Sequence, residues 1–219
     1  MNPNRASRVV VLAVASAGLL AACSLSPKED PTRYYVLSTL GEGSDLYPAA
    51  GLDGATEEEA SLSGGPHLGI SVGVGPIVFP GYLNRTRMAT RLADNQLKYL
   101  EVHRWAQPLV ESFQWAMVGN LGMLLWSDGV IFYPWYNTRQ PDYAVEVDVA
   151  RFERSHDGSA ILGARWTVRD AGGAILASDS FNQVLSADSA SVAASVNAQS
   201  QLVAKMSRDI ADALRRVAS

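Results

Sequence analysis

The chain has 219 residues, and its 22 acidic residues outnumber its 18 basic ones, for a formal net charge of −4. The sequence shows no basic stripe, which argues against nucleic acid as a partner. One cysteine and three histidines, none of them paired at ligand spacing, argue against a disulfide framework, a metal site or another cofactor.

The N-terminus has the layout of an export signal. Arg5 and Arg8 precede an unbroken run of apolar and small residues over 9–22, which fits a signal peptide and is too short for a membrane span. The run ends at Cys23 in Leu-Ala-Ala-Cys, which looks like a bacterial lipobox. We therefore predict a signal peptide over residues 1–22 and lipidation of Cys23. The alternative is an ordinary signal peptide followed by a chance cysteine, and it is weakened because Cys23 is the only cysteine.

Residues 23–32 are predicted to form a polar tether between the lipid and a single domain over 33–219. No other segment is apolar enough to span a bilayer, so the mature chain is expected to be anchored to a membrane rather than embedded in it. Ser24 follows the cysteine, where an Asp would be the usual signal for retention at the inner membrane. This predicts an outer-membrane lipoprotein that faces the periplasm.

The first part of the domain is predicted to contain two strands separated by a loop. Apolar and aromatic residues predict a first strand over 34–37. Residues 41–66 are rich in Gly, Ser, Ala and acidic residues and poor in large apolar ones, so we predict a flexible loop there. Ile70, Val72 and Val74 then alternate with small residues, which predicts a strand with one face in the core.

A hairpin and a helix are predicted next. Two short strands over 87–92 and 98–102 flank residues with turn chemistry. Pro108 suits the first turn of a helix, and apolar residues then recur at helical spacing. Trp115 and Trp126 lie on or beside this helix, and the sequence favours burial of both.

A short strand over 130–133 precedes the clearest pattern in the chain. Three alternating segments joined by tight turns predict an antiparallel meander. These segments cover residues 143–149, 162–168 and 175–185. A long helix follows over 188–217, with an interruption at Gln199 and Ser200. This order of elements predicts an α+β fold, namely a mostly antiparallel sheet with a three-stranded C-terminal meander and two helices packed on it.

One enzyme motif is present in form. Residues 69–73 read G-x-S-x-G, which in α/β-hydrolases holds the serine on a sharp turn between a strand and a helix. Ser71 instead lies within an alternating strand pattern that runs into Val-Gly-Pro-Ile. The sequence therefore favours a protein that is not an enzyme and has no catalytic residues. A lipid-anchored serine hydrolase that uses Ser71 is kept as an alternative.

Aromatic residues form a dense run at Phe132-Tyr133-Pro134-Trp135-Tyr136. Aromatic side chains more often fill interiors than mark sites, so burial is the leading interpretation. An exposed run would be a contact site for protein or lipid. In that case Trp135 and Tyr136 are the candidate contact residues.

Motifs between residues 78 and 109 resemble those of a known family. They read Val78-Phe79-Pro80-Gly81-Tyr82-Leu83-Asn84-Arg85, then Met88-Ala89-Thr90-Arg91, then Asn95-Gln96-Leu97, and then Arg104-Trp105-Ala106-Gln107-Pro108-Leu109. The lipobox and the early strand precede these motifs, and the meander and the long helix follow them. In this order the chain resembles the PqiC/YmbA family, the lipoprotein auxiliary components of MCE-type ABC transport systems.

The resemblance implies a role without catalysis. Such lipoproteins accompany MCE proteins, which carry lipids between the two membranes of a Gram-negative envelope. It therefore implies an auxiliary or docking subunit that binds an MCE-domain protein and its ABC permease system, and a homo-oligomer would suit docking onto such a partner. The motif residues implied in partner binding are Tyr82, Arg85, Arg104, Trp105 and Pro108. A structural lipoprotein that serves envelope assembly without transport is the remaining alternative.

Overall fold

The computed structural model describes residues 29–40, 69–126, 129–135 and 140–219. The chain divides into two compact units, Met1–Pro31 and Thr32–Ser219, and the described helices and strands all belong to the second unit. The predicted signal peptide, Cys23 and the predicted loop over 41–66 lie outside the described residues. Within the described part, no helix is both long and apolar enough to cross a membrane.

The C-terminal meander is confirmed. Strands β6 (Tyr143–Ser155), β7 (Ala160–Asp170) and β8 (Ile175–Leu185) pair in antiparallel order through long ladders. The valines of β6 that alternate in the sequence are all buried. The two turns contain Gly158 at φ 96° and Gly173 at φ 85°, a backbone region that L-residues rarely adopt.

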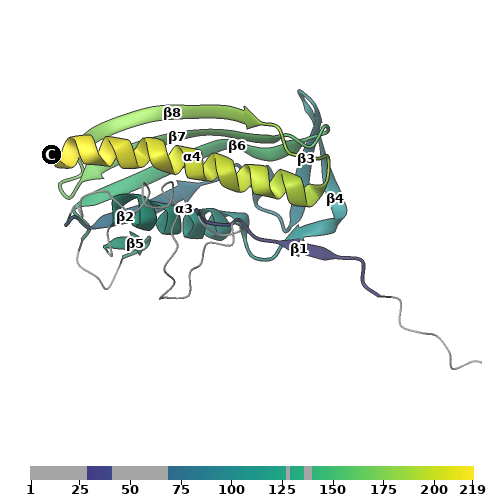
Figure 1. The fold of residues 1–219 in the computed structure, drawn as a ribbon, viewed down its shortest axis with the longest axis horizontal. Helices are drawn as coiled ribbons and strands as arrows, with labels where there is room; N and C mark the ends of the chain where they lie inside the picture. Colours follow the sequence, from purple (N-terminus) through teal and green to yellow (C-terminus); the bar gives the residue numbers. More distant parts are fainter. Residues whose placement is uncertain (1–28, 41–68, 127–128, 136–139) are drawn as a thin grey trace, which may run out of the picture. The chain divides into compact units, whose positions relative to one another are not determined.

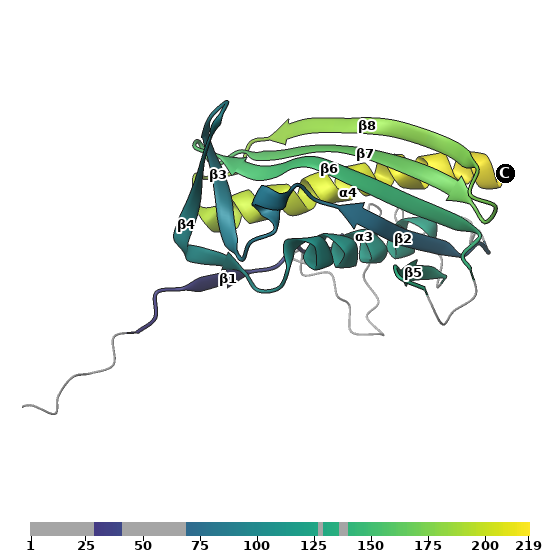
Figure 2. The same ribbon diagram turned by 180° about the vertical axis from the view of Figure 1, so that it is seen from behind.

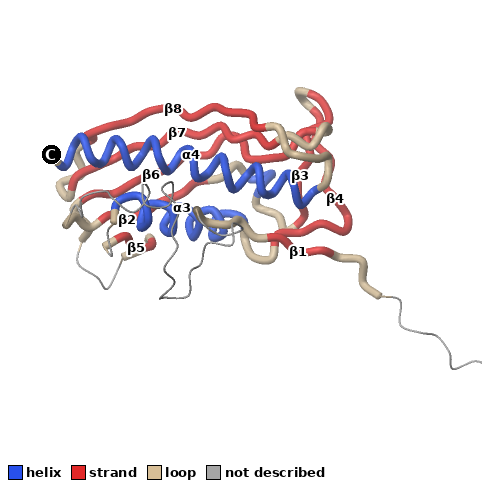
Figure 3. Tube along the Cα trace, viewed as in Figure 1, coloured by secondary structure: helices blue, strands red, loops and turns tan. Residues whose placement is uncertain are grey.

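The rest of the sheet combines the predicted hairpin with parallel pairings. Strands β3 (Arg87–Ala93) and β4 (Gln96–Trp105) form the hairpin. The parallel ladders join β1 (Arg33–Tyr35) to β4, β3 to β6, and β2 (Val72–Val78) to both β6 and β5 (Val130–Phe132). The sheet therefore runs β1-β4-β3-β6-β2-β5, and β7 and β8 continue from the other side of β6 (Figures 1 and 3).

Two helices pack against this sheet, as predicted for the α+β class. Helix α4 (Val192–Ala218) runs along β7 and β8, and helix α3 (Leu109–Leu125) lies beside α4 near β2 and β5 (Figures 1 and 2). Helix α4 begins where the Ser191 hydroxyl accepts a hydrogen bond from the Ala194 N–H at 3.1 Å, a typical N-cap.

The predicted interruption of the last helix is wrong, because α4 is continuous through Gln199 and Ser200. Both residues are buried. The Ser200 hydroxyl donates to the carbonyl of Val196 at 3.0 Å and accepts from the Ser38 N–H at 3.1 Å. A serine that bonds within its own helix and to a neighbouring segment does not need to end the helix.

The segment after β1 explains why serine and asparagine occur on the buried faces of the helices. The Leu37 N–H donates to Ser112 Oγ at 3.1 Å, and the Leu40 N–H donates to Asn120 Oδ1 at 2.7 Å. Helix α3 therefore supplies acceptors for backbone groups that would otherwise be buried without partners. The first strand accordingly ends at Tyr35, two residues earlier than predicted, and residues 37–40 continue across α3.

Candidate partner-binding surfaces

Aromatic side chains surround the sheet edge at β5, which pairs only with β2 among the described strands. We call Trp115, Phe132, Tyr133 and Trp135 the β5 edge. The ring centroids of Trp115 and Phe132 lie 4.2 Å apart, and those of Tyr133 and Trp135 lie 5.1 Å apart. Trp115 is 59% exposed and Tyr133 is 39% exposed. The predicted contact residue Tyr136 lies outside the described residues.

Two glycines of β2 allow the aromatic run to lie this close to the sheet. A Cβ at Gly73 would approach Trp135 Cζ3 to 2.5 Å, and a Cβ at Gly75 would approach Tyr133 Cβ to 2.5 Å. The predicted picture of β2, with one buried face and one face of small outward residues, is therefore incomplete. Over residues 72–75 both faces are buried, because the aromatic run covers the glycine face.

A side chain of α3 fixes this arrangement. The amide nitrogen of Gln114 donates to the carbonyl oxygen of Val74 at 2.8 Å and to that of Tyr133 at 3.1 Å. One amide thus ties the helix, the sheet and the aromatic run together. The exposed rings are consequently held on a rigid scaffold, which lowers the entropy cost of binding a partner.

The predicted burial of Trp115 and Trp126 is wrong. The buried face of α3 is built from Phe113, Met117 and Leu121 together with smaller residues, and Trp115 points away from it. Trp126 follows the helix in a left-handed conformation at φ 51° and is also exposed. The helix is apolar on nearly every side, so periodicity could not distinguish its inner face from its outer one.

Tyr82, the first of the predicted partner-binding residues, belongs to a network of polar groups around Glu153. Its hydroxyl donates to Glu153 Oε2 at 2.6 Å, and Glu153 Oε1 accepts from Arg91 Nε at 2.5 Å and from Arg151 Nε at 3.2 Å. Burial and the contact with Glu153 raise the pKa of Tyr82. The hydrogen bond to Glu153 raises the pKa of Arg91. Tyr82 is therefore engaged in the fold and only partly available to a partner.

The other motif residues lie in different environments. Trp105 is buried in the core, so any part it plays in binding is indirect. Pro108 is exposed at the start of α3, and the exposed Arg85 stacks over the Tyr99 ring at 5.3 Å from its centroid. Arg104 is partly exposed and has a buried Nε without a hydrogen-bond partner.

The G-x-S-x-G motif lacks the geometry of a nucleophile elbow. Ser71 directly precedes β2, which runs to Val78 and is followed by a single 3-10 turn (Gly81–Leu83) and not by an α-helix. Its hydroxyl donates to Asp142 Oδ2 at 2.8 Å and accepts from the Asp142 N–H at 2.9 Å. The described histidines have other partners, since His103 bonds to the Tyr35 hydroxyl and His156 to Ser155. Ser71 therefore joins the start of β2 to the start of β6.

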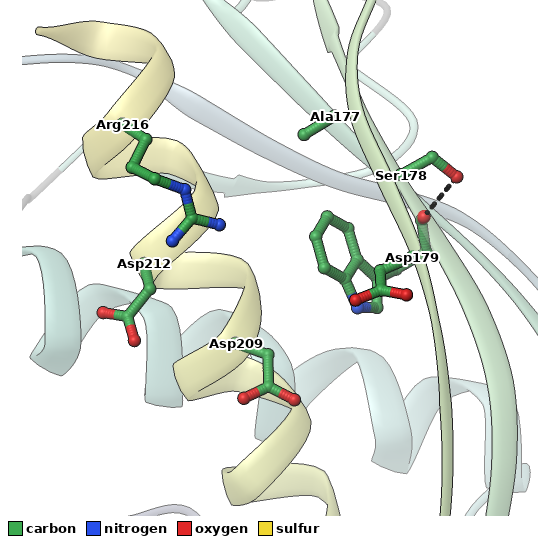
Figure 4. A pocket seen from close by; sticks show the side chains of 7 residues that line it. Ala177, Ser178, Asp179, Asp209, Asp212 and Arg216 are labelled. Atoms are coloured by element: carbon green, nitrogen blue, oxygen red, sulfur yellow. Dashed lines mark hydrogen bonds between the residues drawn. The ribbon is translucent and has the colours of Figure 1, made fainter.

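A depression of about 370 Å³ lies between β8 and α4 (Figure 4). Its lining includes Trp166, Asp179, Asp209, Asp212 and Arg216. Burial and the neighbouring carboxylates of Asp212 and Asp179 raise the pKa of Asp209. Across the part of the chain that the structure describes, no group of three or more potential metal ligands occurs. No metal site is therefore identified at this depression among the described residues.

Two solved structures show that this α+β fold occurs in other proteins. A protein of Xanthomonas campestris assigned to the DUF330 family model is 16% identical, with 82% of this chain and 93% of that chain covered and a TM-score of 0.61. A crystal structure described as that of an uncharacterized protein is 21% identical, with 65% and 90% covered and a TM-score of 0.57. A search of curated proteins gives no match.

The described part of the chain is thus an α+β domain that carries an exposed aromatic cluster, the β5 edge. A family model described as the ABC-type transport auxiliary lipoprotein component matches residues 51–211. The chain belongs to this family. The resemblance inferred from the motifs between residues 78 and 109 is thereby confirmed.

Proposed function

We propose that this protein is a lipid-anchored docking subunit of an MCE-type ABC transport system that moves lipid between the two membranes of the envelope. Membership of the transport-auxiliary family supports the association with an ABC system. The chain would be cleaved before Cys23, lipidated there and held at the outer membrane facing the periplasm. It would act by binding and not by catalysis.

The observation that carries the docking role is the rigid β5 edge. Tryptophan and tyrosine are the residues that most often dominate binding energy at protein interfaces. Trp115 and Tyr133 are exposed although nearby apolar side chains are buried, and Gln114 holds their elements together. An exposed aromatic cluster of this kind costs solubility unless a partner covers it.

The test is affinity capture from envelope extracts with the full lipidated chain as bait. We expect an MCE-domain protein and its permease to be captured, and capture to fall when Trp115→Ala and Tyr133→Ala are combined. The matched control is Ile175→Ala with Val184→Ala, because these residues are also large, apolar and exposed but lie on β8. Repeated failure to capture an MCE-domain protein with the folded, anchored chain would contradict the proposal.

The anchor requires its own experiment. Cys23→Ala is expected to give a protein that folds but no longer supports transport, measured as detergent sensitivity and lipid asymmetry of the envelope in a complemented deletion strain. Full function of this variant would remove the anchor from the mechanism. A deletion strain with unchanged detergent sensitivity and lipid asymmetry would favour the alternative of a structural envelope-assembly lipoprotein.

A further inference from the structure

Three side chains form a row across strands β1, β4 and β3. In the β1·β4 ladder Tyr34 is opposite Arg104, and in the β3·β4 ladder Arg104 is opposite Arg87. Residues directly opposite each other on neighbouring strands point to the same face of a sheet. Tyr34, Arg104 and Arg87 therefore lie side by side on one face, and we call them the arginine row.

The arginine row faces away from the core. Tyr35 and Trp105, the next residues on β1 and β4, belong to or pack against the core, and successive residues of a strand point to opposite faces. Tyr34 is 62% exposed, and Val36, two residues further on, is 56% exposed. The row thus presents the Tyr34 ring and the Arg87 guanidinium on an accessible face, together with a partly buried Arg104.

The described residues compensate the charge of the two arginines only weakly. Like charges directly opposite each other on neighbouring strands destabilise a sheet. Arg87 pairs with the exposed Glu101 at 3.4 Å, a kind of surface pair that contributes little. Arg104 forms no ion pair with any described residue, and its buried Nε lacks a hydrogen-bond partner. The positive charge of the row is therefore left largely uncompensated by the described residues, as an anion-binding site requires.

The position of β1 in the sequence suggests the source of that anion. Ten positions separate Cys23 from Arg33, and ten extended residues span at most about 35 Å. If Cys23 carries the lipid, β1 and its neighbours stay close to the bilayer. Anionic lipids attract arginine side chains near the membrane surface, guanidinium groups bind phosphate in a bidentate manner, and tyrosine favours the membrane–water interface.

We propose that the arginine row of Tyr34, Arg104 and Arg87 is a membrane-contact site that binds the phosphate groups of anionic lipids. This inference rests on the lipid anchor of the proposed function and not on the identity of the transport partner. The contact orients the domain, so that the face with the row lies on the membrane. A chain with a net negative charge needs such a local basic site to lie against an anionic bilayer rather than being repelled by it.

The experiment uses the lipidated full-length mature chain reconstituted into vesicles of phosphatidylcholine, with or without phosphatidylglycerol. A fluorophore on Val36→Cys reports contact with the bilayer through quenching by a lipid-borne quencher, and the same label on Val184→Cys of β8 is the reference position. We expect phosphatidylglycerol to increase quenching at position 36 only. Equal quenching in both vesicles, or an equal increase at both positions, would overturn the proposal.

Charge variants identify the residues responsible. Combining Arg87→Gln with Arg104→Gln is expected to abolish the increase in quenching at position 36. Each arginine should contribute about fivefold to the equilibrium constant for contact between the domain and the bilayer. The matched control combines Arg165→Gln on β7 with Arg208→Gln on α4, since both are exposed arginines outside the row, and it is expected to retain the increase. Unchanged melting temperatures show that both variants are folded.

The remaining outcomes also decide the question. If the Arg87 and Arg104 variants retain the quenching increase but lose capture of an MCE-domain protein, the row binds an acidic protein surface and the membrane proposal is wrong. If the mature chain carries no lipid, no anchor holds β1 near the bilayer and the membrane proposal is wrong. Failure to capture any MCE-domain protein leaves the vesicle result unaffected, because no partner is present in the vesicles.

Discussion

Strand β6 buries charged side chains, whereas helix α3 exposes a tryptophan. Glu153 and Arg154 of β6 are 1% and 8% exposed, whereas Trp115 of α3 is 59% exposed. Folded proteins usually bury tryptophan more than glutamate or arginine. The two regions therefore depart from the common pattern in opposite directions within one domain.

The hydrogen bonds of the two regions explain the difference. Glu153 accepts from Tyr82, Arg91 and Arg151, and Arg154 donates to Thr90, Ser195 and the carbonyl of Ala190. These buried charges are satisfied within the chain, so they serve the fold. Among the described residues the ring of Trp115 pairs with that of the partly buried Phe132, and most of its side chain stays exposed, as we propose for a surface that a partner covers.

The largest effect is expected from the loss of the buried carboxylate. Glu153→Ala leaves Arg91, Arg151 and Tyr82 without their acceptor, and breaking a buried ion pair from one side costs about 3–5 kcal/mol. Urea denaturation would measure the free energy of unfolding. Glu101→Ala is the control, because the Glu101–Arg87 pair is exposed and its loss should cost less than about 1 kcal/mol. Similar losses in the two variants would contradict the distinction drawn between structural and exposed charges.

A smaller loss is expected at the neighbouring position. Burial lowers the pKa of Arg154, but its guanidinium still reaches three acceptors on three different segments. Arg154→Lys retains the charge and cannot reproduce this planar fork, so we expect a loss of about 1–3 kcal/mol in the free energy of unfolding. Wild-type stability in urea would show that the hydrogen bonds of Arg154 do not support the fold.

Gly73 of β2 lies under the aromatic run and leaves no room for a side chain. Gly73→Ala would bring a Cβ to 2.5 Å from Trp135 Cζ3 and 2.8 Å from Pro141 Cγ, so we expect overpacking to cost about 1–3 kcal/mol and to change tryptophan fluorescence. Gly81→Ala is the control, because no atom lies within 4 Å of its added Cβ and its φ is not in the left-handed range. Equal effects of the two substitutions would exclude close packing as the reason for Gly73.

The smallest effect is expected in the pH dependence of stability. Burial, with added repulsion from Arg33 and Arg154, lowers the pKa of His103. The unfolded chain therefore binds a proton at His103 more readily than the folded chain does. The free energy of unfolding consequently decreases as the pH falls from about 6.5, the usual pKa of histidine, through the lower pKa of His103 in the folded chain. Melting temperatures between neutral and mildly acidic pH should fall less in His103→Gln than in the wild type. An identical fall in both would exclude His103 as a source.

The sequence predicts this fold well where structure is set by local periodicity. The strands β6 to β8, the β3–β4 hairpin and the buried face of α4 follow from alternation, turn residues and helical spacing. The parallel pairings of β1 with β4 and of β2 with β6 join distant segments, and no local pattern encodes them.

The candidate sites were less predictable. The sequence marks Trp135 and Arg104 as candidates, but it predicts burial of Trp115 and gives no signal at Arg87. The last two residues gain their importance from neighbours that the fold brings beside them. Phe132 meets Trp115 across a helix–strand contact, and Arg87 meets Arg104 through strand register. The buried Glu153 was also missed, since its partners come from three separate segments.

The most direct test of the docking role is to measure stability and binding in the same variants. For Trp115→Ala combined with Tyr133→Ala, we expect affinity for a purified MCE-domain protein to fall by at least about tenfold. The free energy of unfolding should remain close to that of the wild type, and Ile175→Ala with Val184→Ala should retain both properties. Wild-type affinity in the Trp115 and Tyr133 variant, with the protein folded, would contradict the assignment of the β5 edge as the docking surface.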